Sequence, residues 1–433
     1  MEGQVGWNDP RLETPGMVRM EVDGEGRLLK LEAVAPAERE VSADTTAPDW
    51  TALFEAAGLD PDAFTPTDPT RTPLVHCDTR AAWVGAFPEA PDIALRVEAG
   101  SFEGRPVYFE LLGPWNEPRG STPPLEAGDR IVITIFLTLF LLIPVAGAFI
   151  AVRNLRAGRG DRKGATWLAI YVFTISMGGW LLTADHALSL GEWAMLWRAF
   201  ANATGSALIC WILYLAIEPY ARRQWPHAMI SWSRLLSGRF RDPLVGRDIL
   251  VGCIAGALIC LTVGLTQLSA TLLDRPPPAP LQSTNLEILR GGRYVAGGLF
   301  GAQRSVGIWI GAFVLLLLLR MVLRRQWLAV VAFYVVLLGI FSGGFAADPE
   351  DWLVAIIFPL LILVTMIRFG LLSLVVMGLV VPLLIGYPTT VDFSRWHAGA
   401  GAIGPAAALA LGVAGFWISL AGRPLFRDEL LQT

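Results

Sequence analysis

Charged residues are scarce in this sequence: they make up 17% of its 433 positions, whereas 54% are hydrophobic. The mean hydropathy of +0.51 is too high for a soluble globular protein and indicates a multi-pass membrane protein. The charges are also divided unevenly, with a net charge of −13 over residues 1–128 and +9 over residues 129–433. An acidic first part argues against nucleic acid as a partner, because nucleic-acid binding depends on basic surface.

Cysteine is rare as well. Cys77 stands alone in the acidic part, and Cys210, Cys253 and Cys260 lie in apolar runs. This pattern is not a disulfide framework, and no spacing of cysteine and histidine is typical of zinc. We find no P-loop, no HExxH, no Ser/His/Asp set and no glutamate-pair pattern of intramembrane proteases. The sequence therefore predicts no enzyme, no metal and no cofactor.

Residues 1–128 are predicted to form a small α+β soluble domain. Alternating apolar residues predict hairpins over 17–34 and 94–113, each with a glycine-containing turn. A short helix is expected over 51–58, where Gly58 is its stop signal. The proline-rich stretch 114–128 then reads as a linker into the membrane.

The remainder predicts an α-helical multi-pass bundle, residues 129–422, followed by a cytoplasmic tail, residues 423–433. Nine apolar runs are of about 16–25 residues, near the length that crosses a bilayer as a helix. They span 131–152, 165–185, 193–217, 249–270, 305–323, 327–347, 352–367, 369–386 and 399–421. The seventh and eighth are separated only by residues 368–370, so a single tilted helix, and a total of eight spans, is the alternative.

Basic residues predict the orientation of these spans. With the N-terminal domain outside, the inner segments carry 17 basic residues and the outer loops carry 5. Cytoplasmic loops are enriched in lysine and arginine, so the N-terminal domain is expected outside and the C-terminus inside. The start of the sequence lacks the basic and apolar regions of a signal peptide. We therefore expect an upstream span in a longer natural protein, the alternative being unaided translocation.

The segment 218–248 is the most basic of the inner connections, with six arginines and two tryptophans. Within it, the spacing of Met229, Trp232, Leu236 and Phe240 predicts one apolar face of a short helix over 226–240. We interpret this helix as lying in the inner membrane interface. A solvated loop anchored by tryptophans is the alternative.

Three stretches resemble the C-terminal membrane region of large bacterial membrane-anchored serine/threonine protein kinases: PGMVRMEVDGEGRLLKLEAV, RNLRAGRGDRKGA and LAIEPYARRQWPHAMISWSRLLSGRFRDPLVGRDILVG. The resemblance extends over nearly the whole chain. In those proteins a cytoplasmic kinase domain and one span precede an extracytoplasmic domain and a multi-pass bundle. The resemblance implies a bacterial inner-membrane protein, and it implies a kinase domain as a partner in cis.

The chain departs from such kinases in its catalytic motifs. It has no glycine-rich loop followed by a VAIK-type lysine, no HRD-type loop and no DFG. We therefore expect a non-catalytic sensory and anchoring membrane module of a kinase-type signalling protein, with an unidentified ligand and with a second copy of itself as a candidate partner. The alternatives are a transporter or carrier with an extracytoplasmic accessory domain, and a purely structural anchor. A buried polar cavity would favour transport, and a solid apolar bundle would favour sensing or anchoring.

Polar residues near the ends of the predicted spans are the candidate functional residues. The outer pair Asp185 and His186 is typical of a pH or ion sensor, or of a satisfied boundary pair. Arg198 and Asn202 lie one helical turn apart in the third span, where intramembrane polar residues suggest function unless the arginine extends to the interface. Glu218 is expected to pair with Arg222 four residues later.

The inner and outer connections supply the remaining candidates. Arg241 with Asp242, and Arg247 with Asp248, are expected to organise the inner loop or to dock a partner. Asp392, Arg395, Trp396 and His397 form an outer polar cluster that would either line a ligand cavity or belong to an interfacial belt of aromatic and polar residues.

Overall fold

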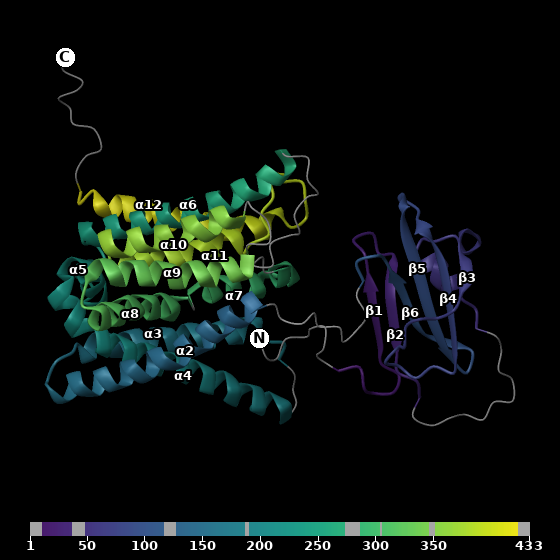
Figure 1. Cartoon of the computed structure of the whole chain (residues 1–433), viewed down its shortest axis with the longest axis horizontal. Coiled ribbons are helices and arrows are strands. Elements are labelled where there is room, and N and C mark those ends of the chain that lie inside the picture. The colour runs from purple at the N-terminus through teal and green to yellow at the C-terminus, as the bar shows by residue number, and fades with distance from the viewer. Residues whose placement is uncertain are drawn as a thin grey trace, which may run out of the picture. The chain divides into compact units, whose positions relative to one another are not determined.

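A computed structural model describes residues 11–36, 48–116, 127–186, 190–272, 286–303, 305–345 and 351–422. The chain divides into two compact units, Gln4–Pro124 and the remainder from Leu125 onward. The first unit is built on a β-sheet and the second is a bundle of helices (Figure 1).

The first unit contains one antiparallel sheet of six strands in the order β1-β2-β6-β5-β4-β3. The strands are β1 (Val18–Val22), β2 (Leu28–Ala33), β3 (Thr65–Thr67), β4 (Thr79–Phe87), β5 (Ala90–Phe102) and β6 (Arg105–Leu112). Both predicted hairpins are confirmed, as β1–β2 and β5–β6. The turn of the second hairpin uses Glu103 and Gly104 at φ of 52° and 74°, a left-handed conformation that glycine adopts at little cost.

The short helix predicted over 51–58 is confirmed as α1 (Thr51–Ala56), the only α-helix described in this unit, and the sheet has more strands than the two predicted hairpins supply. Phe54 of α1 is 2% exposed, and its ring packs edge-on against Trp83 of β4 and Phe109 of β6 at centroid distances of 5.2 and 5.8 Å. Strand β4 was missed because its sequence, TRAAWVGAF, has small residues in place of regular apolar alternation. One face of the sheet and one short helix therefore enclose an aromatic core.

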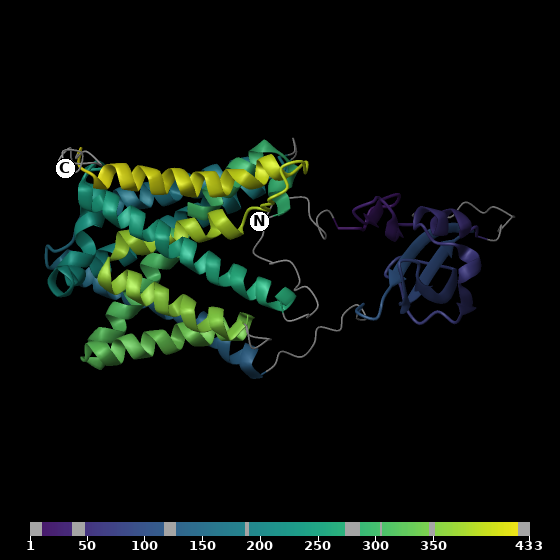
Figure 2. The ribbon, with the colours of Figure 1, turned by 90° about the horizontal axis from the view of Figure 1, so that it is seen from above.

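The second unit consists of helices that run side by side (Figures 1 and 2). They are α2 (Ala127–Arg156), α3 (Arg162–Thr183), α4 (Leu190–Gln224), α5 (Pro226–Leu236), α6 (Pro243–Leu272), α7 (Gly292–Gln303), α8 (Val306–Leu323), α9 (Gln326–Phe345), α10 (Asp351–Arg368), α11 (Leu371–Ile385) and α12 (Ala398–Ser419). Each of the nine predicted apolar runs is helical over most of its described residues, and the differences lie at the ends of the runs.

Six described helices are long and apolar enough to cross a membrane: Ile133–Arg156, Arg162–Thr183, Leu190–Gln224, Pro243–Thr266, Gly292–Leu323 and Ala398–Ser419. Three shorter apolar helices accompany them: Gln326–Ser342, Trp352–Arg368 and Leu371–Ile385. The protein is therefore an integral membrane protein with several spans. We expected nine full-length crossings, and six of the described helices have the length and hydropathy that a crossing requires.

Helices α10 and α11 are separate, so the single tilted helix that we considered is wrong. Gly370 between them has φ of +94°, which a residue with a side chain rarely adopts. A Cβ atom at this position would lie 2.5 Å from the carbonyl oxygen of Ala228 in α5. The turn between the two helices therefore depends on glycine, because the chain passes directly against the backbone of α5.

Candidate functional site

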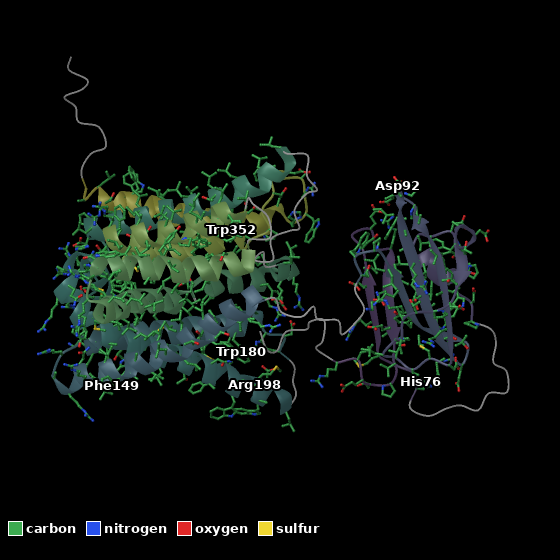
Figure 3. The ribbon with its side chains drawn as sticks, in the orientation of Figure 1. His76, Asp92, Phe149, Trp180, Arg198 and Trp352 are labelled. Carbon is green, nitrogen blue, oxygen red and sulfur yellow. The ribbon has the colours of Figure 1, made fainter. Side chains whose placement is uncertain are left out.

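Connections between helices gather around α5 at one end of the bundle, which we call the α5 end. It comprises the α2–α3, α8–α9 and α10–α11 turns and the α4–α5–α6 segment, and nitrogen atoms concentrate there (Figure 3). Most of the buried polar side chains described in the bundle lie at this end: Asn154, Glu218, Ser231, Asp248, Thr365 and Ser373. The remaining one, Thr183, lies near the opposite end, which we call the α7 end, and it donates to the carbonyl of Gly179 within its own helix.

Asn154 compensates for a proline inside α4. Pro219 has no N–H group, so the carbonyl oxygen of Leu215, four residues earlier, lacks its helical donor. The side-chain amide of Asn154, at the end of α2, donates to the carbonyls of Leu215 and Ala216 at 2.9 and 3.1 Å. Asn154 is 4% exposed, so this contact links α2 to α4 in the protein interior. The sequence analysis missed it, although a proline in an apolar run signals an unsatisfied carbonyl.

Glu218 joins α4 to the α2–α3 turn. Its side chain pairs with Arg222 one turn later, as we predicted, and its second oxygen accepts a hydrogen bond of 3.2 Å from the backbone N–H of Asp161. Asp161 in turn caps α3, because its carboxylate accepts from the N–H of Gly164 at 2.9 Å. Glu218 is only 4% exposed, so these contacts satisfy a buried carboxylate and fix three elements together.

Helix α5 confirms the helix that we predicted in the basic segment, although it ends at Leu236, before Gly238 at φ of +82°. Met229 and Trp232 are 1% and 3% exposed and belong to the bundle core. The predicted apolar face is therefore covered by protein, which corrects our interpretation of a helix whose apolar face lies in lipid. Periodicity reveals an apolar face but not what covers it. Phe240 lies beyond the helix and is 61% exposed.

The charged residues after α5 organise its connection to α6. The guanidinium of Arg234 donates to both carboxylate oxygens of Asp242 at 2.7 Å, and these hydrogen bonds hold the pKa of Asp242 below its ordinary value. Asp248 is 1% exposed and accepts from Arg247 at 2.8 and 2.9 Å. Arg241, which we had grouped with Asp242, is exposed and forms no ion pair with a described residue.

Asp185 and His186 point to different partners at the α7 end. Asp185 accepts from Arg293 and Tyr294 at 2.5 Å and from Arg290 at 3.1 Å, which ties the end of α3 to α7 and to the segment before it. His186 contacts Glu192 of α4 at 2.6 Å. The hydrogen bond to Glu192 raises the pKa of His186 above its ordinary value. The side chains of Asp185 and His186 therefore bind different partners and do not act as the pair that the sequence suggested.

The other predicted residues lie on exposed surface. Arg198 and Asn202 lie one turn apart on α4 and are both exposed, and Arg198 lies toward the α7 end of the bundle (Figure 3). Asp392 and Arg395 are brought together at 3.3 Å in the turn before α12, and both are at least half exposed. The hydroxyl and backbone N–H of Ser394 hydrogen-bond Asp392 and lower its pKa. His397 begins α12 with its ring against Trp396.

The sequence analysis also missed a buried row of charges on the sheet unit. Lys30 pairs with Glu110 at 2.8 Å, and Arg96 pairs with Glu98 at 2.7 Å. Glu98 is 1% exposed and accepts from the backbone N–H and hydroxyl of Thr70 at 2.9 and 2.8 Å. Burial acts to raise the pKa of Glu98, but the hydrogen bonds from Thr70, Arg96 and Arg71 hold it below the ordinary value. Alternating polar residues in the predicted hairpins were the available signal.

The described partners of these groups are other side chains and backbone groups of the same chain. No group of histidine, cysteine and acidic residues suited to a metal occurs among the described residues. Comparison with protein-family models, curated proteins and solved structures finds no match. The resemblance to the membrane region of serine/threonine kinases therefore remains a prediction.

Proposed function

We propose that the chain is a non-catalytic sensory and anchoring membrane module of a serine/threonine-kinase-type signalling protein. In this proposal the sheet unit is the extracytoplasmic receiver, and the bundle anchors it and carries its state to a cytoplasmic partner. The proposal is supported by two compact units of different character, one an acidic sheet domain and one an apolar helical bundle. The partner would be a kinase domain, in cis in the proteins that the chain resembles.

The observation that carries this proposal is the position of the buried polar side chains in the bundle. Those described lie at its two ends, and the interior between is lined by apolar residues such as Ile310, Phe313 and Phe333, all fully buried. A carrier needs polar or charged groups near the midplane to hold its substrate. A solid apolar interior instead suits an element that anchors or transmits.

The connections at the α5 end are where a signal would leave the bundle. Asn154, Glu218 and Asp161 link α2, α3 and α4, and α5 packs on the same region. Transmission requires two arrangements of such a network that a ligand stabilises unequally. The basic character of this end favours the cytoplasmic side.

Topology is the first test. Alkaline phosphatase and fluorescent-protein fusions would be placed after Gly120 and after Gly238 in the native gene. We expect an extracytoplasmic signal at Gly120 and a cytoplasmic signal at Gly238. The reverse pattern would refute an exported receiver domain.

The sensory role needs a second test, because a mere anchor would have the same topology. The chain would be fused behind a bacterial serine/threonine kinase domain and one span, and autophosphorylation in membranes would be compared with and without residues 11–116. We expect deletion to change autophosphorylation several-fold, whereas the exposed substitution Glu55→Gln on α1 changes nothing. Equal activity with and without the sheet unit would leave only anchoring.

A further inference from the structure

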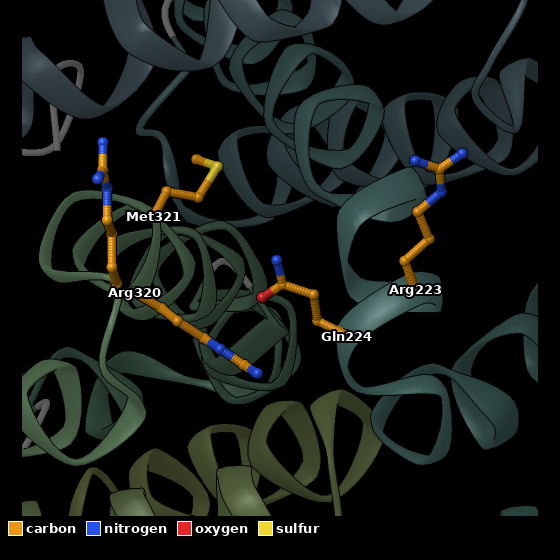
Figure 4. A pocket seen from close by; sticks show the side chains of 5 residues that line it. Arg223, Gln224, Arg320 and Met321 are labelled. Carbon is orange, nitrogen blue, oxygen red and sulfur yellow. The ribbon is translucent and has the colours of Figure 1, made fainter.

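Three arginines of the α5 end surround an open depression between the ends of α4 and α8. The depression measures about 640 Å³ and is lined by Arg223, Gln224, Arg320, Met321 and Arg324. Arg223 and Gln224 come from α4, and Arg320 and Met321 from α8 (Figure 4). The site is distinct from the buried links of Asn154 and Glu218 described above.

None of the three arginines has a carboxylate partner among the described residues. The described acidic residues of the α5 end are already engaged: Glu218 with Arg222, Asp242 with Arg234, Asp248 with Arg247, and Asp161 as the cap of α3. The positive charges of the three side chains that line the depression are therefore not offset by a described carboxylate, and an anion from outside the described residues can offset them.

Arg320 is held in place rather than free in solvent. Its guanidinium carbon lies 4.7 Å from the centre of the buried Trp225 ring, a cation–π contact. Its Nη1 atom is buried and has no hydrogen-bond partner among the described residues. Arg324, one turn later, adopts φ of +56°, a left-handed conformation that is uncommon for a residue with a side chain. Because its side chain is already held, Arg320 loses little side-chain entropy when an anion binds.

We propose that this depression is a binding site for a phosphate group. Guanidinium groups match the oxygen geometry of phosphate, and Arg320 has a buried Nη1 atom with no hydrogen-bond partner among the described residues. Basic pockets between membrane helices are also typical sites for phosphate headgroups of anionic lipids. The same chemistry would accept the phosphate of a soluble ester, so the test has an arm for each source.

The test uses the full chain purified in detergent and in nanodiscs. In the lipid arm, native mass spectrometry measures retention of phosphatidic acid or cardiolipin against phosphatidylcholine. In the soluble arm, inorganic phosphate and glycerol 3-phosphate are titrated while the thermal unfolding midpoint is followed. The pocket variant is Arg223→Gln/Arg320→Gln/Arg324→Gln. The matched control is Arg156→Gln/Arg159→Gln/Arg241→Gln, which removes three exposed charges of the same end outside the depression.

We expect selective binding by the wild type and the control, and its loss in the pocket variant, with affinity about tenfold lower for each arginine removed. Retention of anionic lipid identifies a headgroup site, and a response to the soluble phosphates alone identifies a free phosphate site. Equal losses in both triple variants would mean attraction by bulk charge and would overturn the proposal, as would absence of binding in both arms. If removal of Arg320 prevents folding, the exposed pair Arg223→Gln/Arg324→Gln is compared with Arg156→Gln/Arg241→Gln, with the same outcomes.

Discussion

The contact between Asn154 and the proline-interrupted part of α4 yields a sharp prediction about stability. Asn154→Leu keeps the side-chain size but removes two donors, at 2.9 and 3.1 Å, from the carbonyls of Leu215 and Ala216. Each lost bond is worth about 1 kcal/mol, and a buried carbonyl left unpaired costs roughly 1–3 kcal/mol. Because hydrogen bonds within membrane proteins average less than this, we expect a loss of about 2 kcal/mol in the free energy of unfolding.

The proline supplies the internal control for that prediction. Pro219→Ala restores a backbone N–H that can donate to Leu215, so Asn154→Leu should cost much less in that background. Unfolding free energies of the four proteins would be measured in mixed detergent micelles. The exposed substitution Asn202→Leu, the same chemical change on the outer face of α4, should have almost no effect. An equal cost of Asn154→Leu with proline or alanine at position 219 would refute the assignment of its role.

Three further predictions concern a glycine and two titrating groups. Gly370→Ala should destabilise the bundle by about 2 kcal/mol or more, since the φ of +94° and the nearby carbonyl of Ala228 exclude a Cβ atom. Gly339→Ala, in open space on α9, should have no such effect, and thermal unfolding would compare the two variants. The pKa of His186 is raised by Glu192, so its contribution to stability is complete below the ordinary value of 6.5 and disappears as pH rises through the folded-state pKa. Glu192→Gln should abolish that loss in unfolding curves taken on the alkaline side of 6.5, and an unchanged pH profile would contradict the contact. The pKa of Glu98 is lowered, so its contribution is present above the ordinary value of 4.5 and is lost as pH falls through the folded-state pKa. Glu98→Gln should lower the unfolding temperature of the sheet unit at neutral pH and weaken its acid sensitivity, and an unchanged melting temperature would count against the buried ion pair.

Local chain properties predicted most of the secondary structure. Alternation of apolar residues around glycine turns gave both hairpins of the sheet unit, and apolar runs gave the helices of the bundle. Strand β4 and the short strand β3 escaped because small residues and Thr65–Thr67 carry little periodic signal. The start of the helix in the basic segment was predicted correctly, but the helix ends at Leu236 rather than at residue 240, just before Gly238 at a positive φ.

The candidate site was predicted less well, because a contact between distant residues leaves no local pattern. Asp185 was noticed as a neighbour of His186, yet its partners Arg290, Arg293 and Tyr294 follow three further helices, α4, α5 and α6, along the chain. Asn154 was not noticed at all, since only the packing of α2 against α4 places it beside the carbonyl that Pro219 leaves unpaired. Arg198 and Asn202 share a helical face, but only the assembled bundle shows that this face is exposed.

By itself, the sequence determined that this is a multi-pass membrane protein with an acidic domain and strongly basic connections, since length, hydropathy and charge are properties of the chain alone. Only the tertiary structure decided which charges are neutralised. It pairs Arg222, Arg234 and Arg247 with carboxylates, whereas Arg223, Arg320 and Arg324 line one depression and have no carboxylate partner in the part of the chain that the structure describes. The physical reason is that Coulomb interactions act through space over a few ångströms, and the distances between helices are set by packing rather than by spacing along the chain.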